Sequence, residues 1–204
     1  MSKRLLATAS IGALAALLLT VPALAALQPG AKAPVFTAEA SLAGEEFTFS
    51  LDQALARGPV VLYFYPAAFT HGCDVEAHTF ATHKAQFTAA GATIIGVSAD
   101  SIQRLNRFSS DPDYCAGKFP VASDPGGRIA ADYGLEMIPP QKGVVDVNGN
   151  TVEHGFIPRT TFVLDGSGEI VAVFSTSADK LTPVQHVTKS LAIVEKMQAE
   201  KSGK

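Results

Sequence analysis

The residues Pro59-Val-Val-Leu-Tyr-Phe-Tyr65, followed by Pro66-Ala-Ala-Phe-Thr-His-Gly-Cys73, form the stretch that decides the fold of this 204-residue chain. The first half is an almost continuous apolar run, which is typical of a central strand buried on both faces of a sheet. Pro66 ends that strand, and Thr70 predicts the N-cap of a helix that continues to about Ala90. A buried strand that turns directly into a helix is typical of α/β folds.

The rest of residues 26–204 alternates strand and helix patterns without a repeat or a linker, so we expect one domain. The pattern predicts an α/β fold in which a mixed central sheet is flanked by helices on both faces. Active sites in such sheets lie at the carboxyl ends of strands, which points to the corner between Tyr65 and Thr70. The expected elements are hairpins over 36–51 and 160–176, strands over 92–98 and 120–123, helices over 101–110 and 127–133, and a terminal helix that starts at Thr182-Pro183. The apolar face of that terminal helix is expected to comprise Val184, Val187, Leu191, Val194 and Met197.

Residues 1–25 have the pattern of a secretory signal peptide. Two basic residues precede an apolar run from Leu5 to Val21, and Ala23-Leu-Ala25 predicts a cleavage site. The run is also long enough for an uncleaved membrane anchor, an alternative that the small-x-small end disfavours. We therefore predict an exported protein, periplasmic in a cell with an outer membrane, with 26–204 as its working domain and no membrane association after cleavage.

The overall charge and the cysteine count exclude several classes of protein. Sixteen Lys and Arg residues against 19 Asp and Glu residues give a net charge of −3, so no nucleic-acid partner is expected. Two cysteines are too few for a disulfide-stapled miniprotein or a four-cysteine zinc site. Export would place both cysteines in an oxidising compartment, where disulfides form and persist.

Cys73 is expected at the third position of the helix that Thr70 opens. A sulfur at this position lies near unpaired backbone N–H groups and the positive end of the helix dipole. This placement favours a thiolate and predicts a lowered pKa for Cys73. A thiolate is the nucleophile that attacks peroxides and disulfides. The alternative is a buried structural cysteine or one half of a stabilising disulfide.

The spacing Pro66-x-x-x-Thr70-x-x-Cys73 resembles the active-site signature of the peroxiredoxins, which are thiol peroxidases with a thioredoxin-like fold. Glu76 fits the same pattern, and Pro158-Arg159-Thr-Thr-Phe-Val-Leu-Asp165 resembles the arginine-bearing strand of that family. The resemblance extends over nearly all of residues 26–204 in order and spacing. It implies a thioredoxin-like fold and a peroxidase that needs no cofactor and no metal.

The resemblance also implies roles for individual residues. Cys73 would attack a hydroperoxide, and Arg159 would add a fixed positive charge beside the sulfur and donate to a peroxide oxygen. The Thr70 hydroxyl would donate to the sulfur or the peroxide, Pro66 would shield the pocket from water, and Glu76 would orient Arg159. The plainer alternatives are a surface salt bridge for Arg159, a helix cap for Thr70, a turn proline and a solvated glutamate.

Cys115 is the second cysteine, and no Cys-x-x-Cys pair is present, which disfavours a thioredoxin-type disulfide donor. The resemblance is greatest to the Q or bacterioferritin-comigratory peroxiredoxins, some of which carry a resolving cysteine on the next helix, shortly before a Phe-Pro pair. Cys115 precedes Phe119-Pro120 in this way. The resemblance therefore implies an intramolecular Cys73–Cys115 disulfide, an external dithiol reductant of thioredoxin type, and a monomer or weak dimer.

Two competing interpretations remain open at the level of sequence. His71, Cys73, His78 and His83 lie close together and suggest a copper or zinc site, although positions five apart progressively leave one helix face. The second alternative is an exported thioredoxin-fold domain whose disulfide is inert. Residues 141–154 predict an extra hairpin, to which no function is assigned.

Overall fold

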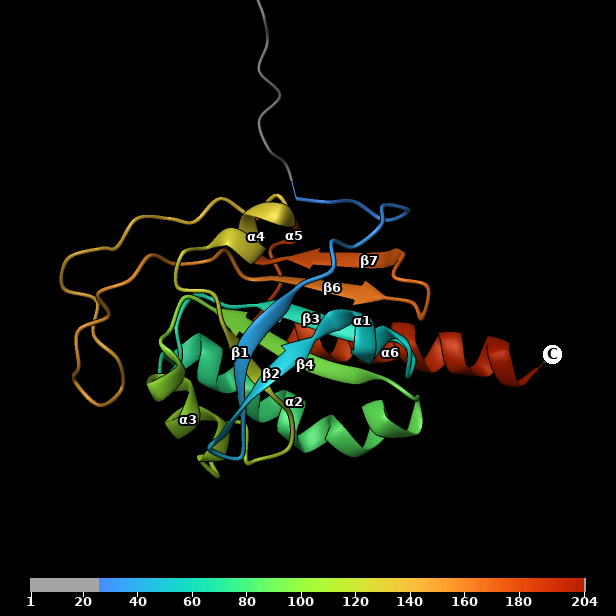
Figure 1. Ribbon diagram of the computed structural model, residues 1–204, viewed down its shortest axis with the longest axis horizontal. Coiled ribbons are helices and arrows are strands. Elements are labelled where there is room, and N and C mark those ends of the chain that lie inside the picture. Colours follow the sequence, from blue (N-terminus) through green and yellow to red (C-terminus); the bar gives the residue numbers. More distant parts are fainter. Residues whose placement is uncertain (1–25, 204) are drawn as a thin grey trace, which may run out of the picture.

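The computed structural model describes residues 26–203, so the predicted signal peptide at 1–25 lies outside the described residues. The core is a seven-stranded sheet in the order β2-β1-β5-β4-β3-β6-β7, with helices on both faces (Figure 1). Within residues 26–203, no helix has both the length and the apolar character needed to cross a bilayer. The strands are β1 (Thr37–Leu42), β2 (Glu45–Ser50), β3 (Val60–Phe64), β4 (Thr93–Ser98), β5 (Val121–Ser123), β6 (Thr160–Leu164) and β7 (Ile170–Ser175).

Strand β3 lies near the centre of the sheet, and all five of its residues are buried. It pairs in parallel with β4, where Leu62 faces Ile95, and antiparallel with β6, where Leu62 faces Phe162. The sheet is therefore mixed, as the alternation of strands and helices with a final hairpin predicts. The carboxyl end of β3 consequently lies next to the start of β6, where Phe64 pairs with Thr160. Residues that are distant in sequence therefore meet at this corner.

Side chains of β3 alternate between two apolar clusters, one on each face of the sheet. Tyr63 belongs to the cluster formed with α2 (His71–Ala89), α3 (Ile102–Ser110) and α6 (Pro183–Ser202). Leu62 belongs to the cluster formed with α1 (Leu51–Leu55) and α4 (Arg128–Asp132). The thioredoxin-like fold with helices on both faces is thus confirmed. The sequence did not predict the short helices α1 and α5 (Thr176–Asp179). Each is about one turn long and begins at a serine side-chain cap, so it is too short to show a helical spacing of apolar residues.

The buried face of α6 differs in part from the expected apolar row. Val184 is 43% exposed in the first turn, whereas His186 and Ser190 are fully buried beside the expected valines and leucine. The burial of His186 is possible because both of its ring nitrogens have partners, the hydroxyls of Thr161 and Thr176 at 2.9 and 3.0 Å. A polar side chain with satisfied hydrogen bonds therefore occupies a position on the packed face.

Residues 138–156 form a long loop at one end of the molecule (Figure 1, yellow to orange). The hairpin predicted within this segment appears as two isolated antiparallel bridges, Ile138 with Phe156 and Val145 with Thr151. We call this segment the 138–156 loop. It touches the corner that follows β3, because the Val147 N–H donates to the Phe69 carbonyl at 2.8 Å.

Candidate active site

The corner between β3 and α2 turns within a few residues. Pro66 is half-buried in it, and Phe69 has a positive φ of 58°, which is unusual for a residue with a side chain. Helix α2 then begins with Thr70 as its N-cap. The Thr70 hydroxyl does not cap the helix, however, because it donates back to the Ala67 carbonyl at 2.7 Å. The expectation of a side-chain cap is therefore wrong, whereas the third helical position of Cys73 is confirmed.

The Cys73 sulfur accepts a hydrogen bond from Arg159. The cysteine is 2% exposed, and Arg159 Nη2 lies 3.1 Å from Cys73 Sγ. This meeting follows from the sheet, because Phe64 at the end of β3 pairs with Thr160 at the start of β6. Arg159 immediately precedes β6 and so reaches across one strand spacing to the start of α2.

Glu76 and Gly72 determine where the Arg159 guanidinium can lie. Arg159 Nη1 pairs with Glu76 Oε2, and the glutamate is fully buried one turn after Cys73 on the same helix. A Cβ atom at Gly72 would lie only 3.2 Å from Arg159 Nη2, closer than most such contacts. The structure thus pairs the buried Glu76 with Arg159, and the missing side chain at Gly72 leaves room for the guanidinium.

Two opposing effects act on the Cys73 thiol. Burial raises its pKa above the ordinary value, while the Arg159 guanidinium, the Thr70 hydroxyl and the Ala67 backbone oppose that rise. The lowered pKa expected from the helix start is therefore wrong for this closed geometry, because a buried thiolate loses its hydration. Burial likewise raises the pKa of Glu76 to about 7, although Arg159 lowers it.

His186 is a residue of this site that the sequence did not reveal. Its Nδ1 atom lies 4.0 Å from Glu76 Oε1, so successive polar contacts connect Cys73 to Arg159, Arg159 to Glu76 and Glu76 to His186. Burial and the nearby Arg159 charge lower the pKa of His186 to about 4, so the ring is neutral at pH 7. In the sequence, His186 stands next to Val187 in the apolar row of the terminal helix. That position predicts a packed side chain and does not predict a contact with the active-site residues.

Cys115 lies in the turn that connects α3 to β5 and is fully buried. Burial raises the pKa of this thiol well above its ordinary value, and the nearby carboxylates of Asp111 and Asp74 raise it further. The turn closes through local backbone bonds, and the next residue, Ala116, has a positive φ of 52°. Cys73 and Cys115 are both free thiols and belong to the same apolar cluster.

The histidines near Cys73 do not converge on a common point. His71 is exposed, His78 Nδ1 lies 3.0 Å from the Asp113 carbonyl, and His83 Nδ1 lies 2.9 Å from the Thr79 carbonyl. In the part of the chain that the structure describes, no group of three or more His, Cys, Asp or Glu side chains is arranged to hold a metal ion. The copper or zinc alternative is therefore not favoured.

Two surface hollows have volumes of about 420 and 440 Å³. The first runs along β7, and the second lies between β2 and the start of β4. Neither is lined by Cys73 or Arg159.

A buried cysteine at the start of α2, with an arginine donor from the neighbouring strand of a thioredoxin-like sheet, defines the peroxiredoxin class of site. Comparison with known families agrees, since the model of the AhpC/TSA family matches residues 29–173, which is more than half of the chain. The chain therefore belongs to the AhpC/TSA family of peroxiredoxins.

Individual relatives point to the Q or bacterioferritin-comigratory type. The chain is 37% identical over 145 residues to "Putative peroxiredoxin Rv2521" of Mycobacterium tuberculosis, covering 71% of this chain and 83% of that protein. It is similar to the crystal structure of peroxidoxin BcpB from Mycobacterium tuberculosis, with a TM-score of 0.66, 27% identity, and coverage of 82% of this chain and 96% of that one. It is also similar to the bacterioferritin comigratory protein of Xanthomonas campestris, with a TM-score of 0.60, 27% identity, and coverage of 78% and 91%. The thiol peroxidase function predicted from the sequence is thereby confirmed.

Proposed function

We propose that Cys73 is the peroxidatic residue of this thiol peroxidase. The observation that carries the proposal is the hydrogen bond from Arg159 Nη2 to the buried Cys73 sulfur at the start of α2. The Cys73 thiolate attacks the terminal oxygen of a hydroperoxide, the O–O bond breaks, and the leaving oxygen takes a proton to become water or an alcohol. Cys73 is then a sulfenic acid, oxidised by two electrons.

The neighbouring residues support this step in distinct ways. Arg159 stabilises the thiolate and donates to the peroxide oxygens as negative charge moves onto them. Glu76 holds the guanidinium in place, Thr70 offers a hydroxyl beside the sulfur, and Pro66 shields the corner from water. We take hydrogen peroxide and organic hydroperoxides as substrates, and the alkyl peroxide reduction activity of the Xanthomonas campestris bacterioferritin comigratory protein supports the second class.

We assign the resolving step to Cys115. Its thiol sulfur attacks the sulfur of the Cys73 sulfenic acid, a disulfide forms, and water leaves. A disulfide requires the two Cα atoms to come within about 7 Å. Both cysteines are buried, so we propose that the first turn of α2 and the turn around Cys115 open in this step. Gly72 in the helix and the positive φ of Ala116 support local opening at these two places.

An external dithiol protein of thioredoxin type would return the disulfide to two thiols by exchange. The pattern of residues 1–25 supports export, in which case the reductant acts outside the cytoplasm. Amino-terminal sequencing of protein from a periplasmic fraction tests this address, and a start at Ala26 is the expected result. Sedimentation of reduced protein tests the expected monomer or weak dimer.

Stopped-flow mixing of reduced protein with hydrogen peroxide tests the proposed function. We expect second-order thiol loss far faster than for free cysteine, and we expect Cys73→Ser to abolish turnover with a dithiol reductant. Cys115→Ser is the matched control, because it removes a buried cysteine of the same cluster but keeps the first step. Thiol loss in the wild-type protein no faster than for free cysteine would contradict the assignment.

A further inference from the structure

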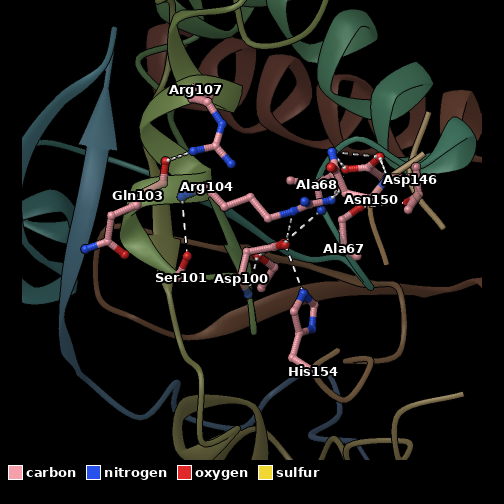
Figure 2. Close-up of polar contacts among 12 residues, drawn as sticks. Ala67, Ala68, Asp100, Ser101, Gln103, Arg104, Arg107, Asp146, Asn150 and His154 are labelled. Atoms are coloured by element: carbon pink, nitrogen blue, oxygen red, sulfur yellow. Dashed lines mark hydrogen bonds and ion pairs between the residues drawn. The ribbon is translucent and has the colours of Figure 1, made fainter. Parts of the chain in front are cut away.

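Two side chains from the junction of β4 and α3 form hydrogen bonds with the backbone of the corner that follows β3. Asp100 Oδ2 accepts the Ala68 N–H at 2.8 Å, and Arg104 Nη2 donates to the Ala68 carbonyl at 2.8 Å (Figure 2). Both polar backbone groups of Ala68 are therefore held by side chains rather than by sheet or helix. The preceding carbonyl, on Ala67, accepts the Thr70 hydroxyl.

Arg104 also separates two buried carboxylates. Its Nε lies 2.8 Å from Asp100 Oδ1 and its Nη2 lies 3.0 Å from Asp146 Oδ2, and both carboxylate side chains are fully buried (Figure 2). His154 Nε2 lies 2.9 Å from Asp100 Oδ1, and the Ser98 hydroxyl donates to Asp100 Oδ2 at 2.7 Å. Loss of the guanidinium would leave two buried negative charges without their main partner, which is strongly unfavourable.

The 138–156 loop contributes three of these attachments to the corner. Asp146 pairs with Arg104, His154 pairs with Asp100, and the Val147 N–H donates to the Phe69 carbonyl. Asp146 is itself held by the backbone N–H groups of Asn148 and Asn150, each at 2.8 Å. The loop therefore presents a fixed acceptor to Arg104, although most of it lies outside the regular elements.

We propose that Arg104, Asp100 and the 138–156 loop form a positioning network that sets the reactivity of Cys73, an inference that rests on the peroxidatic role proposed above. Arg104 and Asp100 form hydrogen bonds with the backbone of Ala68. The neighbouring Ala67 carbonyl accepts the Thr70 hydroxyl. The Thr70 carbonyl in turn accepts the Cys73 N–H at 2.8 Å. Arg104 acts on the sulfur only through these groups, so it is a positioning residue.

The charge of the network supports positioning rather than ligand binding. The positive charges of Arg104 and of His154 when protonated face the carboxylates of Asp100 and Asp146 directly. The guanidinium carbon of Arg104 also lies 5.2 Å from the centre of the Phe69 ring, over the residue with the positive φ. The Arg104 side chain thus contacts both Phe69, the residue with the unusual φ, and the buried carboxylates of Asp100 and Asp146.

Arg104→Gln and Arg107→Gln provide a matched pair of variants. Arg107 lies on the same helix, is exposed, and donates to the Gln103 carbonyl within that helix (Figure 2). Both variants are prepared in a Cys115→Ser background so that Cys73 is the single thiol. Two readouts are taken, the rate of the reaction with hydrogen peroxide and the pH profile of iodoacetamide alkylation.

We expect Arg104→Gln to slow the peroxide reaction by about 10- to 100-fold, in line with the effect of small misplacements in active sites. We expect its alkylation profile to move to higher pH, because Thr70 and the Ala67 backbone would support the thiolate less well. Arg107→Gln is expected to match the parent protein in both measurements. Arg104→Gln values that coincide with those of Arg107→Gln would overturn the proposal.

Arg104→Lys keeps the test decisive if Arg104→Gln does not fold. Lysine keeps the charge but lacks the planar fork that reaches Asp100, Asp146 and Ala68 together, so an intermediate rate is expected. A folded Arg104→Lys protein that reacts at the parent rate would then overturn the proposal. If the parent protein reacts no faster than free cysteine, the peroxidatic role fails instead. The alkylation profile needs no peroxide and still reports whether Arg104 acts on Cys73.

Discussion

Cys73 and Cys115 share one apolar cluster and are buried to a similar degree, yet only Cys73 has a positive charge among the groups that shift its pKa. Cys73 has the Arg159 guanidinium 3.1 Å from its sulfur, and this charge counteracts the rise in pKa that burial causes. Cys115 has the carboxylates of Asp111 and Asp74 nearby, and they add to the effect of burial.

Burial alone therefore does not separate a reactive cysteine from an inert one. A neighbouring positive charge stabilises the thiolate of Cys73, so this sulfur is suited to attack a peroxide. Under the proposed function, Cys115 stays a thiol until Cys73 has been oxidised, in keeping with its raised pKa.

The largest expected effect comes from removing each sulfur in turn. Cys73→Ser should abolish peroxide turnover, because the nucleophile is lost. Cys115→Ser should consume one equivalent of peroxide at close to the wild-type initial rate without turning over, and excess peroxide should then over-oxidise Cys73 in a further reaction. Thiol titration and intact-mass spectra after stepwise peroxide addition check this. Equal behaviour of the two variants would remove the distinction between the cysteines.

Replacing Arg159 should make the surroundings of Cys73 more like those of Cys115. Arg159→Met is expected to slow the peroxide reaction by about 100-fold, the order seen when one donor to a developing negative charge is lost. It should also move the Cys73 alkylation profile to higher pH, since Arg159 lowers the pKa of that thiol. Stopped-flow rates and alkylation profiles measure the two effects.

Arg159→Met also leaves the buried Glu76 without its partner, so its effect on folding needs a control. The double variant Arg159→Met with Glu76→Gln removes the unpaired charge and is expected to regain stability but not rate. Recovery of the rate in the double variant would show that Arg159 acts only on stability.

A smaller effect is expected from a methyl group at Gly72. In Gly72→Ala the added carbon would lie 3.2 Å from Arg159 Nη2, so the guanidinium must move away from the sulfur. We expect the peroxide reaction to slow by about tenfold through this displacement. Gln86→Ala, at an exposed position of the same helix, is the control and should leave the rate unchanged. A wild-type rate in Gly72→Ala would mean that the position of Arg159 is not critical.

The smallest expected effect concerns the pH dependence of stability, through Asp74, which follows Cys73 on α2 and raises the pKa of Cys115. Burial, Asp111 and Asp146 raise the pKa of Asp74 from 3.8 to about 7, while Arg104 lowers it. The folded chain therefore binds more protons than the unfolded chain between about pH 4 and pH 7, and Asp74 contributes a fall in the free energy of unfolding as pH rises through this interval.

Asp74→Asn removes this contribution, so its free energy of unfolding should fall less than that of the wild-type protein from about pH 4 to about pH 8. Urea unfolding at several pH values measures the difference. Asp52→Asn, at an exposed position on α1, is the control and should follow the wild-type curve. Parallel curves for Asp74→Asn and the wild-type protein would contradict the burial effect.

Much of the fold could be predicted because its signals are local. The apolar run at 59–65 and the Gly-rich turn at 166–168 determine strands and a hairpin through the properties of adjacent residues. The Pro66, Thr70 and Cys73 spacing identified the corner for the same reason. The inward position of His186 depends on its hydrogen bonds with Thr161 and Thr176, and the single-turn helices depend on their packing in the fold. The spacing of apolar residues along the sequence does not reveal such contacts.

The same limit applies to the candidate site. The resemblance to the peroxiredoxins implied that Arg159 belongs near Cys73, but the sequence alone did not indicate that Asp100, Arg104 and Asp146 meet behind the corner. Asp146 lies in the 138–156 loop, and the spacing of residues in a loop does not predict which distant side chains it contacts. The pKa of Cys73 was mispredicted because the helix-start argument omits the desolvation of a cysteine that is 2% exposed.

The most direct test of the division between the cysteines is to oxidise reduced wild-type protein with one equivalent of hydrogen peroxide in the presence of a sulfenic-acid trap, and to map the products by peptide mass spectrometry. We predict trapped sulfenic acid on Cys73 at early times, followed by a disulfide between Cys73 and Cys115 within one chain. Trapped sulfenic acid on Cys115, or a final state in which Cys115 stays a free thiol, would contradict this assignment.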